Sequence, residues 1–310
     1  MRIKLIGLLG CGCDEYRNST LQKLKDKARS KGIPFQLMLQ LFCQEEFLRR
    51  LERSEYHDRL ILKGGLFLFS YSGFESRPTM DIDFLALNLS NDQEDMKKII
   101  QTVSHVITEN SCIVFRIKSV VNISEMKSYH GLRIKMLAQI SNTNTPFDID
   151  IGFGDVVVPG VNEIDIPTQL DGFLSPKISS YSLESTIAEK LEIIFDRMET
   201  TSRMNDYYDL FYLASHYDFD SSILIDAKSQ TFNNRGTACN TLTLQNLSLF
   251  YKDTAMISRW NVFARKILAV SLDFQIVIEL IIQFVDPLIH AIEEGKEFQK
   301  KWSCENRLYI

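Results

Sequence analysis

Two aspartates, Asp81 and Asp83, are the residues of this chain best placed to do chemistry. Apolar residues bracket them, which predicts a β-strand, and residues i and i+2 of a strand point to the same face of a sheet. The two carboxylates would repel each other, and one would tend to take up a proton, unless a cation lay between them. Mg²⁺ or Mn²⁺ is the economical reason for such a pair, since a hard divalent cation takes oxygen ligands and leaves room for phosphates. On this tripeptide alone, a solvated edge strand remains an alternative.

A pair of glycines, Gly64 and Gly65, follows Lys63 and precedes this strand. Glycine lets the backbone approach a ligand closely, and the first N–H groups of the helix expected after it point at an anion. A Gly-Gly turn, a short helix and a strand with Asp-x-Asp is the arrangement of the polymerase-β-like nucleotidyltransferases, and the sequence resembles that superfamily. The gap between the glycines and Asp81 is slightly longer than is usual there.

Such an enzyme needs a third carboxylate from a neighbouring strand, to complete a metal site and to act as base on the attacking hydroxyl. The run 147–153 is strand-like and places Asp148 and Asp150 on one face. We choose Asp150 for this role, with Asp148 as second choice. A plain strand end that turns through Gly152 and Gly154 is the alternative explanation of these aspartates.

Two arginines near these carboxylates are candidates for binding phosphate. Arg77 could hold a phosphate through two parallel hydrogen bonds, or pair with nearby carboxylates. Arg133, on a strand expected over 131–140, is either a clamp for a triphosphate or an ordinary cross-strand partner of Asp148 or Asp150.

A second polar group is predicted on helices further along the chain. Ser182 is suited to cap a helix, and Lys190 falls on the inward edge of its apolar stripe, where it either snorkels to water or is held against a charge. Asp206 and Asp209 lie three residues apart, on one face of the next helix. They are either a charge bias at a helix N-terminus or, together with Lys190, a polar group brought inward.

The elements that must position these residues predict an α+β fold, a mixed sheet flanked by helices. We expect an irregular N-terminal arm over 1–17, a core domain with N-terminal helices over 18–175 and a helical domain over 176–310. The segment 156–176 is punctuated by Pro and Gly and indicates a loop or linker. On the helix expected to end near Arg53, the residues Arg49, Arg50 and Arg53 are assigned to a solvated face.

Composition limits the possible partners. The 310 residues carry a net charge of −5, which argues against a uniformly basic surface that coats nucleic acid. Six scattered cysteines without zinc spacing predict free thiols in a reducing cytoplasm. The apolar stretch Phe274–Phe284 is too short to span a bilayer and is expected to be a core helix, so no membrane association is expected.

Four segments in register resemble the AbiEii type of nucleotidyltransferase toxin, a family of abortive-infection (phage-defence) and toxin–antitoxin systems. They are Leu62–Gly65, Arg77–Asp83, Ala188–Leu191 and Arg203–Leu210, and the strands at Tyr129–Arg133 and Asp148–Asp155 also fit. The likeness extends from about Leu21 to Leu213. The arm Met1–Asp14 has no counterpart that we can assign.

The resemblance implies transfer of a nucleotide from an NTP with Mg²⁺, in some members onto the 3′ end of tRNA, which stops translation, and a cognate antitoxin that restrains the toxin. It also implies roles for particular residues. Asp81 and Asp83 would bind metal, and Gly64 and Gly65 would seat the triphosphate. Lys190, Asp209 and Asp206 would complete the active site, and Lys63 and Thr79 match positions of the family's motifs. Our hypothesis is that an RNA 3′-hydroxyl attacks the α-phosphorus. The alternatives are a protein side chain as acceptor and a non-catalytic module that senses a nucleotide.

Overall fold

The computed structural model describes residues 4–75, 77–110, 112–125, 129–238, 240–268 and 271–310, with side chains from Glu15 onward except at 75 and 124–130. The chain folds into two compact units. The first comprises Met1–Gly154 and Asn162–Ser180, and the second comprises Asp155–Val161 and Tyr181–Ile310. The second unit therefore takes a short segment from upstream of the boundary expected at 175.

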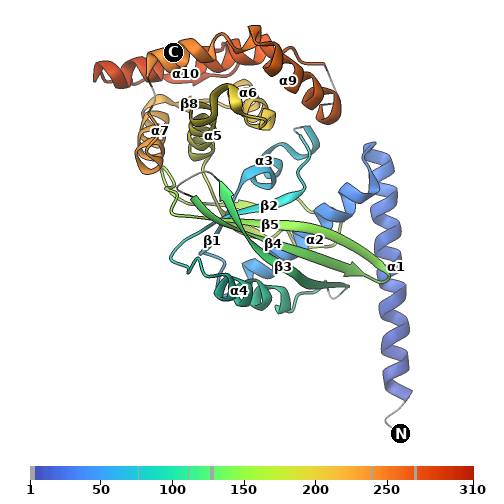
Figure 1. Cartoon of the computed structure of the whole chain (residues 1–310). Coiled ribbons are helices and arrows are strands. Elements are labelled where there is room, and N and C mark those ends of the chain that lie inside the picture. Colours follow the sequence, from blue (N-terminus) through green and yellow to red (C-terminus); the bar gives the residue numbers. More distant parts are fainter. Residues whose placement is uncertain (1–3, 76, 111, 126–128, 239, 269–270) are drawn as a thin grey trace. The chain divides into compact units, whose positions relative to one another are not determined.

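A seven-stranded mixed sheet is the frame of the first unit (Figure 1). Its strands are β1 (Leu60–Lys63), β2 (Asp81–Ala86), β3 (Ile113–Glu125), β4 (Tyr129–Ile140), β5 (Thr143–Phe153), β6 (Asn162–Asp165) and β7 (Lys177–Ser180). Their order is β3-β4-β5-β2-β1-β7-β6. The pairs β2/β5 and β1/β7 are parallel, and the other pairs are antiparallel. The expected α+β class and mixed sheet are thus confirmed, whereas β6 lies in the segment that was predicted to be a linker.

Among the described residues of this unit, four α-helices are present: α1 (Lys4–Lys31), α2 (Phe35–Glu52), α3 (Gly64–Ser72) and α4 (Gln93–His105). The expectation of an irregular arm is wrong for the backbone from Lys4 onward, which continues into α1. Helices α2 and α4 cover one face of the sheet (Figure 1). On that face the ring of Phe47 lies 6.5 Å from Phe84 and 6.4 Å from Phe147. Because side chains alternate along a strand, the neighbouring aspartates of β2 and β5 face the other way.

The arginines of α2 correct a sequence prediction. Arg49 and Arg50 are 1% and 7% exposed, not solvated. Arg49 pairs with Glu45 and Glu46, and Arg50 donates from Nε to Glu46 at 3.0 Å and from Nη2 to the Ile113 carbonyl at 2.8 Å. The helical periodicity of the sequence could not predict this burial, because a charged residue can be buried when its partners lie one turn away on the same helix.

The second unit is mainly helical. Its helices are α5 (Leu183–Arg197), α6 (Met204–His216), α7 (Ser221–Arg235), α8 (Thr241–Leu247), α9 (Thr254–Ile267) and α10 (Phe274–Glu294), and a small sheet has the strands β8 (Phe219–Asp220), β9 (Lys301–Ser303) and β10 (Leu308–Tyr309). The expected cap of α5 is present, since Ser182 Oγ accepts from the Ser185 N–H at 2.9 Å. Trp302 is buried, and its Nε1 donates to the Ala214 carbonyl at 2.8 Å.

Helix α10 continues beyond the apolar stretch Phe274–Phe284, as far as Glu294. Among the described residues it is the one helix whose length and apolarity would allow it to cross a membrane. It packs against α6 and α8 and buries Val277, Ile281 and Phe284. This burial is that of a core helix, as predicted from its apolar N-terminal half.

The buried charges of α2 predict a difference between two neighbouring arginines. Replacement of Arg50 by Met should lower the free energy of unfolding by about 3 kcal/mol, because it leaves buried Glu46 and two carbonyls short of donors. Arg53→Met is the matched control, since Arg53 pairs with an exposed Glu109. Urea unfolding of both variants tests this, and equal midpoints for the two variants would contradict it.

Candidate active site

Four carboxylates lie on one face of two adjacent strands. In the parallel pair of β2 and β5, Asp81 is opposite Asp148 and Asp83 is opposite Asp150. The residues between them, such as Ile82 and Ile149, are fully buried on the opposite face. Strand β2 lies between β1 and β5, so the alternative of a solvated edge strand is wrong.

Burial and crowding together raise the pKa of one of these carboxylates. The pKa of Asp81 is raised to about 6, first by burial and then by the charges of Asp83, Asp150 and Asp148, while Arg133 acts in the opposite direction. A carboxylate in such a place is costly to ionise. A divalent cation between the strands would offset both the burial and the repulsion.

The glycine pair lies directly against Asp83. Gly64 has a φ of +67°, and a Cβ built on it would overlap Asp83 Oδ2 and lie 2.6 Å from Asp83 Cγ. Lys63 is opposite Asp83 in the pairing of β1 with β2. Helix α3 begins at Gly64, so its N-terminus, which favours anions, starts beside the carboxylates. Only glycine combines this backbone conformation with the available space.

The second glycine, Gly65, lies against two further residues that the sequence analysis assigned to the site. A Cβ on Gly65 would lie 2.6 Å from Thr79 Oγ1 and 3.5 Å from Arg77 Nη1. Thr79 is buried, and its hydroxyl donates to the Asp81 carbonyl at 3.4 Å. The structure therefore brings Arg77 and Thr79 to the start of α3, where the sequence predicted a seat for phosphates.

Arg133 on β4 is a cross-strand partner of Asp150, one of the two roles left open by the sequence. Its Nε donates to Asp150 Oδ1 at 2.7 Å and its Nη2 to Asp150 Oδ2 at 2.6 Å. Its Nε also lies 3.6 Å from Asp148 Oδ2. The ion pair occupies both oxygens of Asp150 from one side.

These residues fit a divalent cation in part. Asp81 and Asp83 offer the oxygen ligands that Mg²⁺ prefers, in a place where their charge needs a counter-ion. In the parts of the chain that the structure describes, however, no group of three or more His, Cys, Asp or Glu side chains forms a complete metal site. The role of Asp150 as third ligand or base therefore stays a prediction.

Two glutamines that the sequence analysis overlooked hold the approach to β2. Gln40 and Gln44 are buried on α2, and both donate from their side-chain amides to the carbonyl of Met80, the residue before Asp81. The bond from Gln44 is 2.9 Å long. The available signal was a pair of amides at i and i+4 among apolar residues of a helix, where an unsatisfied amide would be costly.

In the second unit, the predicted inward group is present. Lys190 is 7% exposed, and its Nζ lies 2.9 Å from Asp206 Oδ1 and 2.6 Å from Asp209 Oδ2. Arg203 donates from Nε to the other oxygen of Asp206 at 2.8 Å. Lys190 is thus held against charge and does not snorkel, and the aspartates are an inward polar group, not merely a helix-end charge bias.

Arg235 forms a neighbouring cluster that the sequence did not indicate. This half-buried arginine at the end of α7 lies 2.9 Å from Asp155 and 2.7 Å from Glu192, and it also pairs with Glu189. Two of its partners belong to segments that carried the family resemblance. Through these three ion pairs, Arg235 connects α7 to α5 and to the segment that begins at Asp155.

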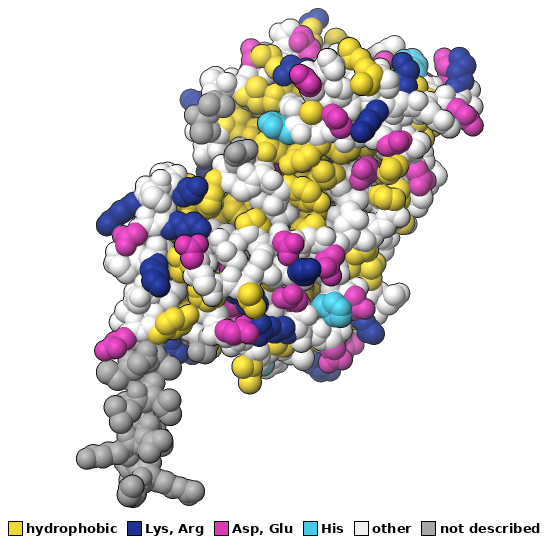
Figure 2. All heavy atoms as spheres, turned by 180° about the vertical axis from the view of Figure 1, so that it is seen from behind, with side chains coloured by type: hydrophobic (Ala, Val, Ile, Leu, Met, Phe, Trp, Pro, Cys, Tyr) yellow, Lys and Arg dark blue, Asp and Glu magenta, His cyan; other side chains and the backbone are white. Residues whose placement is uncertain are grey.

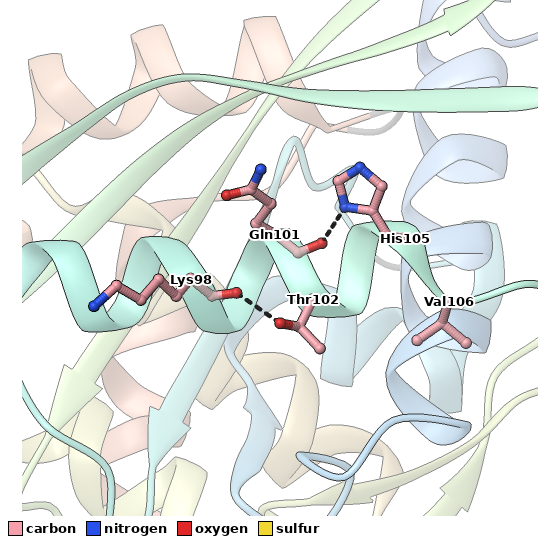
Figure 3. A pocket seen from close by; sticks show the side chains of 5 residues that line it. All are labelled: Lys98, Gln101, Thr102, His105 and Val106. Carbon is pink, nitrogen blue, oxygen red and sulfur yellow. Dashed lines mark hydrogen bonds between the residues drawn. The ribbon is translucent and has the colours of Figure 1, made fainter.

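Other surface features are less suited to chemistry. An open hollow on α4 is lined by Lys98, Gln101, Thr102, His105 and Val106, and Thr102 and His105 bond to carbonyls of their own helix (Figure 3). On the face drawn in Figure 2, acidic and basic side chains are interspersed over the described residues, with no continuous basic stripe.

The arrangement of a glycine turn, a helix N-terminus and aspartates on adjacent strands defines the class of nucleotidyltransferases. In agreement, a family profile described as "Nucleotidyl transferase AbiEii toxin, Type IV TA system" matches residues 46–283. The chain belongs to this AbiEii family of nucleotidyltransferase toxins, as the sequence motifs suggested. No curated protein matches the chain.

The solved structures that are similar to this chain include two from Helicobacter pylori. JHP933 from Helicobacter pylori is 16% identical, and the similarity covers 84% of this chain and 98% of that chain with a TM-score of 0.48. A structure of a proposed nucleotidyltransferase from H. pylori is also 16% identical, with 82% and 95% covered and a TM-score of 0.47.

A pair of glycine substitutions tests the fit at Asp83. Gly64→Ala should lower nucleotidyl transfer by at least about a hundredfold, because a new Cβ displaces the Asp83 carboxylate. Gly73→Ala is the matched control, since Gly73 also has a positive φ but no atom within 4 Å of an added Cβ. Steady-state rates of both variants, with circular dichroism to verify folding, decide this. Equal losses in both would mean that backbone strain alone is responsible.

The raised pKa of Asp81 predicts a dependence of stability on pH. A carboxyl group whose pKa is raised on folding costs stability above that pKa, and the cost disappears as the pH falls toward the ordinary range. Asp81→Asn should therefore raise the melting temperature at about pH 8 and change it little at about pH 4. Added Mg²⁺ should stabilise the wild type at about pH 8 more than it stabilises the variant. Thermal unfolding across this range provides the measurement, and a variant that is less stable at about pH 8 would contradict the account.

Proposed function

We propose that this toxin transfers a nucleotide from an NTP onto an RNA, with the 3′ end of a tRNA as acceptor, in a reaction that depends on Mg²⁺ and blocks translation as part of phage defence. The observation that carries this proposal is the contact of the α3 glycine turn with Asp83. It brings a helix N-terminus suited to phosphates beside carboxylates suited to a divalent cation.

In the proposed reaction, the terminal hydroxyl of the RNA attacks the α-phosphorus and pyrophosphate leaves. Asp81 and Asp83 would hold Mg²⁺, which supplies neutralisation of the triphosphate and of the charge that develops on it. The first amides of α3 would bind phosphate oxygens, and Arg77 would hold a phosphate through two hydrogen bonds. Asp150 would accept the proton of the hydroxyl. Most of the rate would come from positioning and electrostatics.

For the second unit, we propose that Lys190 acts on the leaving pyrophosphate and that Asp209 and Asp206 set its charge and position. Support comes from the contacts of its Nζ with both carboxylates, which hold the buried amine in one position. The partners of the protein are then an NTP, an RNA and, as the family implies, an antitoxin. We propose that the protein acts in the cytoplasm, where these substrates occur.

A protein side chain as acceptor is the second candidate, because the same carboxylates would serve it. A nucleotide-sensing module without activity is a third possibility. The four carboxylates and the glycine pair argue against this third possibility, because a degenerate site need keep neither.

Labelled NTPs test the proposal directly. The purified protein, incubated with total RNA, each α-labelled NTP and Mg²⁺, should label the RNA fraction, and sequencing of the 3′ ends should show added nucleotides on tRNA. Asp83→Asn should reduce labelling by at least about a hundredfold. Asp95→Asn, which removes an exposed carboxylate on α4, is the matched control and should leave labelling unchanged.

Each failure has a distinct meaning. Label that resists ribonuclease but not protease would favour the protein acceptor. Label transfer unaffected by Asp83→Asn would reject the metal-binding role of that residue. A protein that binds NTP without transferring it to either acceptor would favour the sensing module.

The role of Lys190 needs a variant that keeps the second unit folded. Lys190→Met alone leaves Asp206 and Asp209 buried without their amine, so it should destabilise the protein. The double variant Lys190→Met/Asp209→Asn removes one charge of each sign and should unfold closer to the wild type. If Lys190 acts on pyrophosphate, the double variant should still lose at least about a hundredfold in transfer, and a normal rate in it would show that Lys190 is structural.

A further inference from the structure

The ion pair of Arg133 with Asp150 has a consequence for the order of binding at the site, provided that the proposed function holds. Both oxygens of Asp150 accept hydrogen bonds from Arg133, at 2.7 and 2.6 Å. A guanidinium in this position repels a divalent cation and occupies both oxygens of the carboxylate. While this pair persists, Asp150 is therefore poorly suited to bind a metal or to act as a base.

The pair is placed so that it can exchange. The Arg133 side chain is 38% exposed and that of Asp150 is 20% exposed, so the arginine lies at the solvent side of the pair. A guanidinium fork fits a phosphate as well as it fits a carboxylate, through the same two parallel hydrogen bonds. The triphosphate of an NTP would bring several negative charges to the same face of the sheet, since the α3 N-terminus lies against Asp83 of the adjacent strand.

We propose that Arg133 is an exchange residue. In the absence of nucleotide it holds Asp150, and when an NTP binds, it transfers its hydrogen bonds to a phosphate and releases Asp150 toward the divalent cation and the attacking hydroxyl. The two roles considered for Arg133, cross-strand partner and triphosphate clamp, then belong to two successive states. Binding of nucleotide and binding of metal must consequently strengthen each other.

The same strand offers a matched control. Lys135 lies two residues further along β4, opposite Asp148, just as Arg133 lies opposite Asp150. Its removal takes away the same charge from the same strand without touching the Arg133–Asp150 pair. A general electrostatic effect would appear in both variants, whereas the exchange requires Arg133.

Binding of Mn²⁺, followed by electron paramagnetic resonance at about pH 8, tests the proposal without any need for turnover. Without nucleotide, Arg133→Ala should bind Mn²⁺ at least about fivefold more tightly than the wild type, because the repulsive charge is gone. Lys135→Ala should change the affinity by less than about twofold. The double variant Arg133→Ala/Asp150→Asn should lose the gain. An NTP analogue with a methylene bridge between the α- and β-phosphates should tighten Mn²⁺ binding in the wild type and do so much less in Arg133→Ala.

Arg133→Lys, which keeps the charge but not the fork, serves if Arg133→Ala does not fold, and it should bind Mn²⁺ more tightly than both the wild type and Lys135→Ala. The exchange is overturned if Mn²⁺ binds no more tightly after loss of the arginine fork, or if Lys135→Ala has the same effect. Asp83→Asn separates this result from the proposed function. If Asp83→Asn binds Mn²⁺ like the wild type, the proposed metal site itself is wrong. If Asp83→Asn loses affinity for Mn²⁺ but Arg133→Ala binds it like the wild type, only the exchange is rejected.

Discussion

Repulsion among four carboxylates is the constraint on which the rest of the first unit depends. Two parallel strands place Asp81, Asp83, Asp148 and Asp150 in two facing pairs. Burial first, and then the charges of the other three, raise the pKa of Asp81. Such a group is tolerated only where the surrounding fold fixes it firmly and a cation can compensate it. In this structure Arg133 compensates one side of the group, and the start of α3 lies against the other.

The sheet and α2 provide the rigidity. The apolar residues between the aspartates pack under α2, where Phe47 contacts both strands. The side-chain amides of Gln40 and Gln44 on the same helix donate to the carbonyl of Met80, so they fix the position of the backbone just before β2. The ion-paired side chains of α2 attach it in turn to the segments around it, since Glu45 accepts from the Gln169 N–H and Arg50 donates to the Ile113 carbonyl. Small errors in the position of a reacting group are costly, so these supports have functional value even though they never touch a substrate.

The sequence predicted how side chains are oriented within a single helix or strand better than it predicted strand pairing and buried ion pairs. The alternation around Asp81 and the periodicity around Lys190 were sufficient to orient those residues, because both follow from a single element. The pairing of β2 with β5 was only an expectation, since the partner lies far along the chain. The burial of Arg49 and Arg50 was missed, because hydropathy cannot tell a solvated charge from one that is paired within the core. Strand β6 was missed because it is short and mostly exposed, without an alternating pattern.

We propose that Asp81 and Asp83 hold a divalent cation at the N-terminus of α3. A crystal of the protein with Mn²⁺ and a non-reactive NTP analogue, measured at a wavelength where manganese scatters anomalously, tests it most directly. We expect an anomalous peak about 2.1 Å from oxygens of both carboxylates, with the triphosphate at the first turn of α3. A bound nucleotide whose manganese lies away from both aspartates would contradict it.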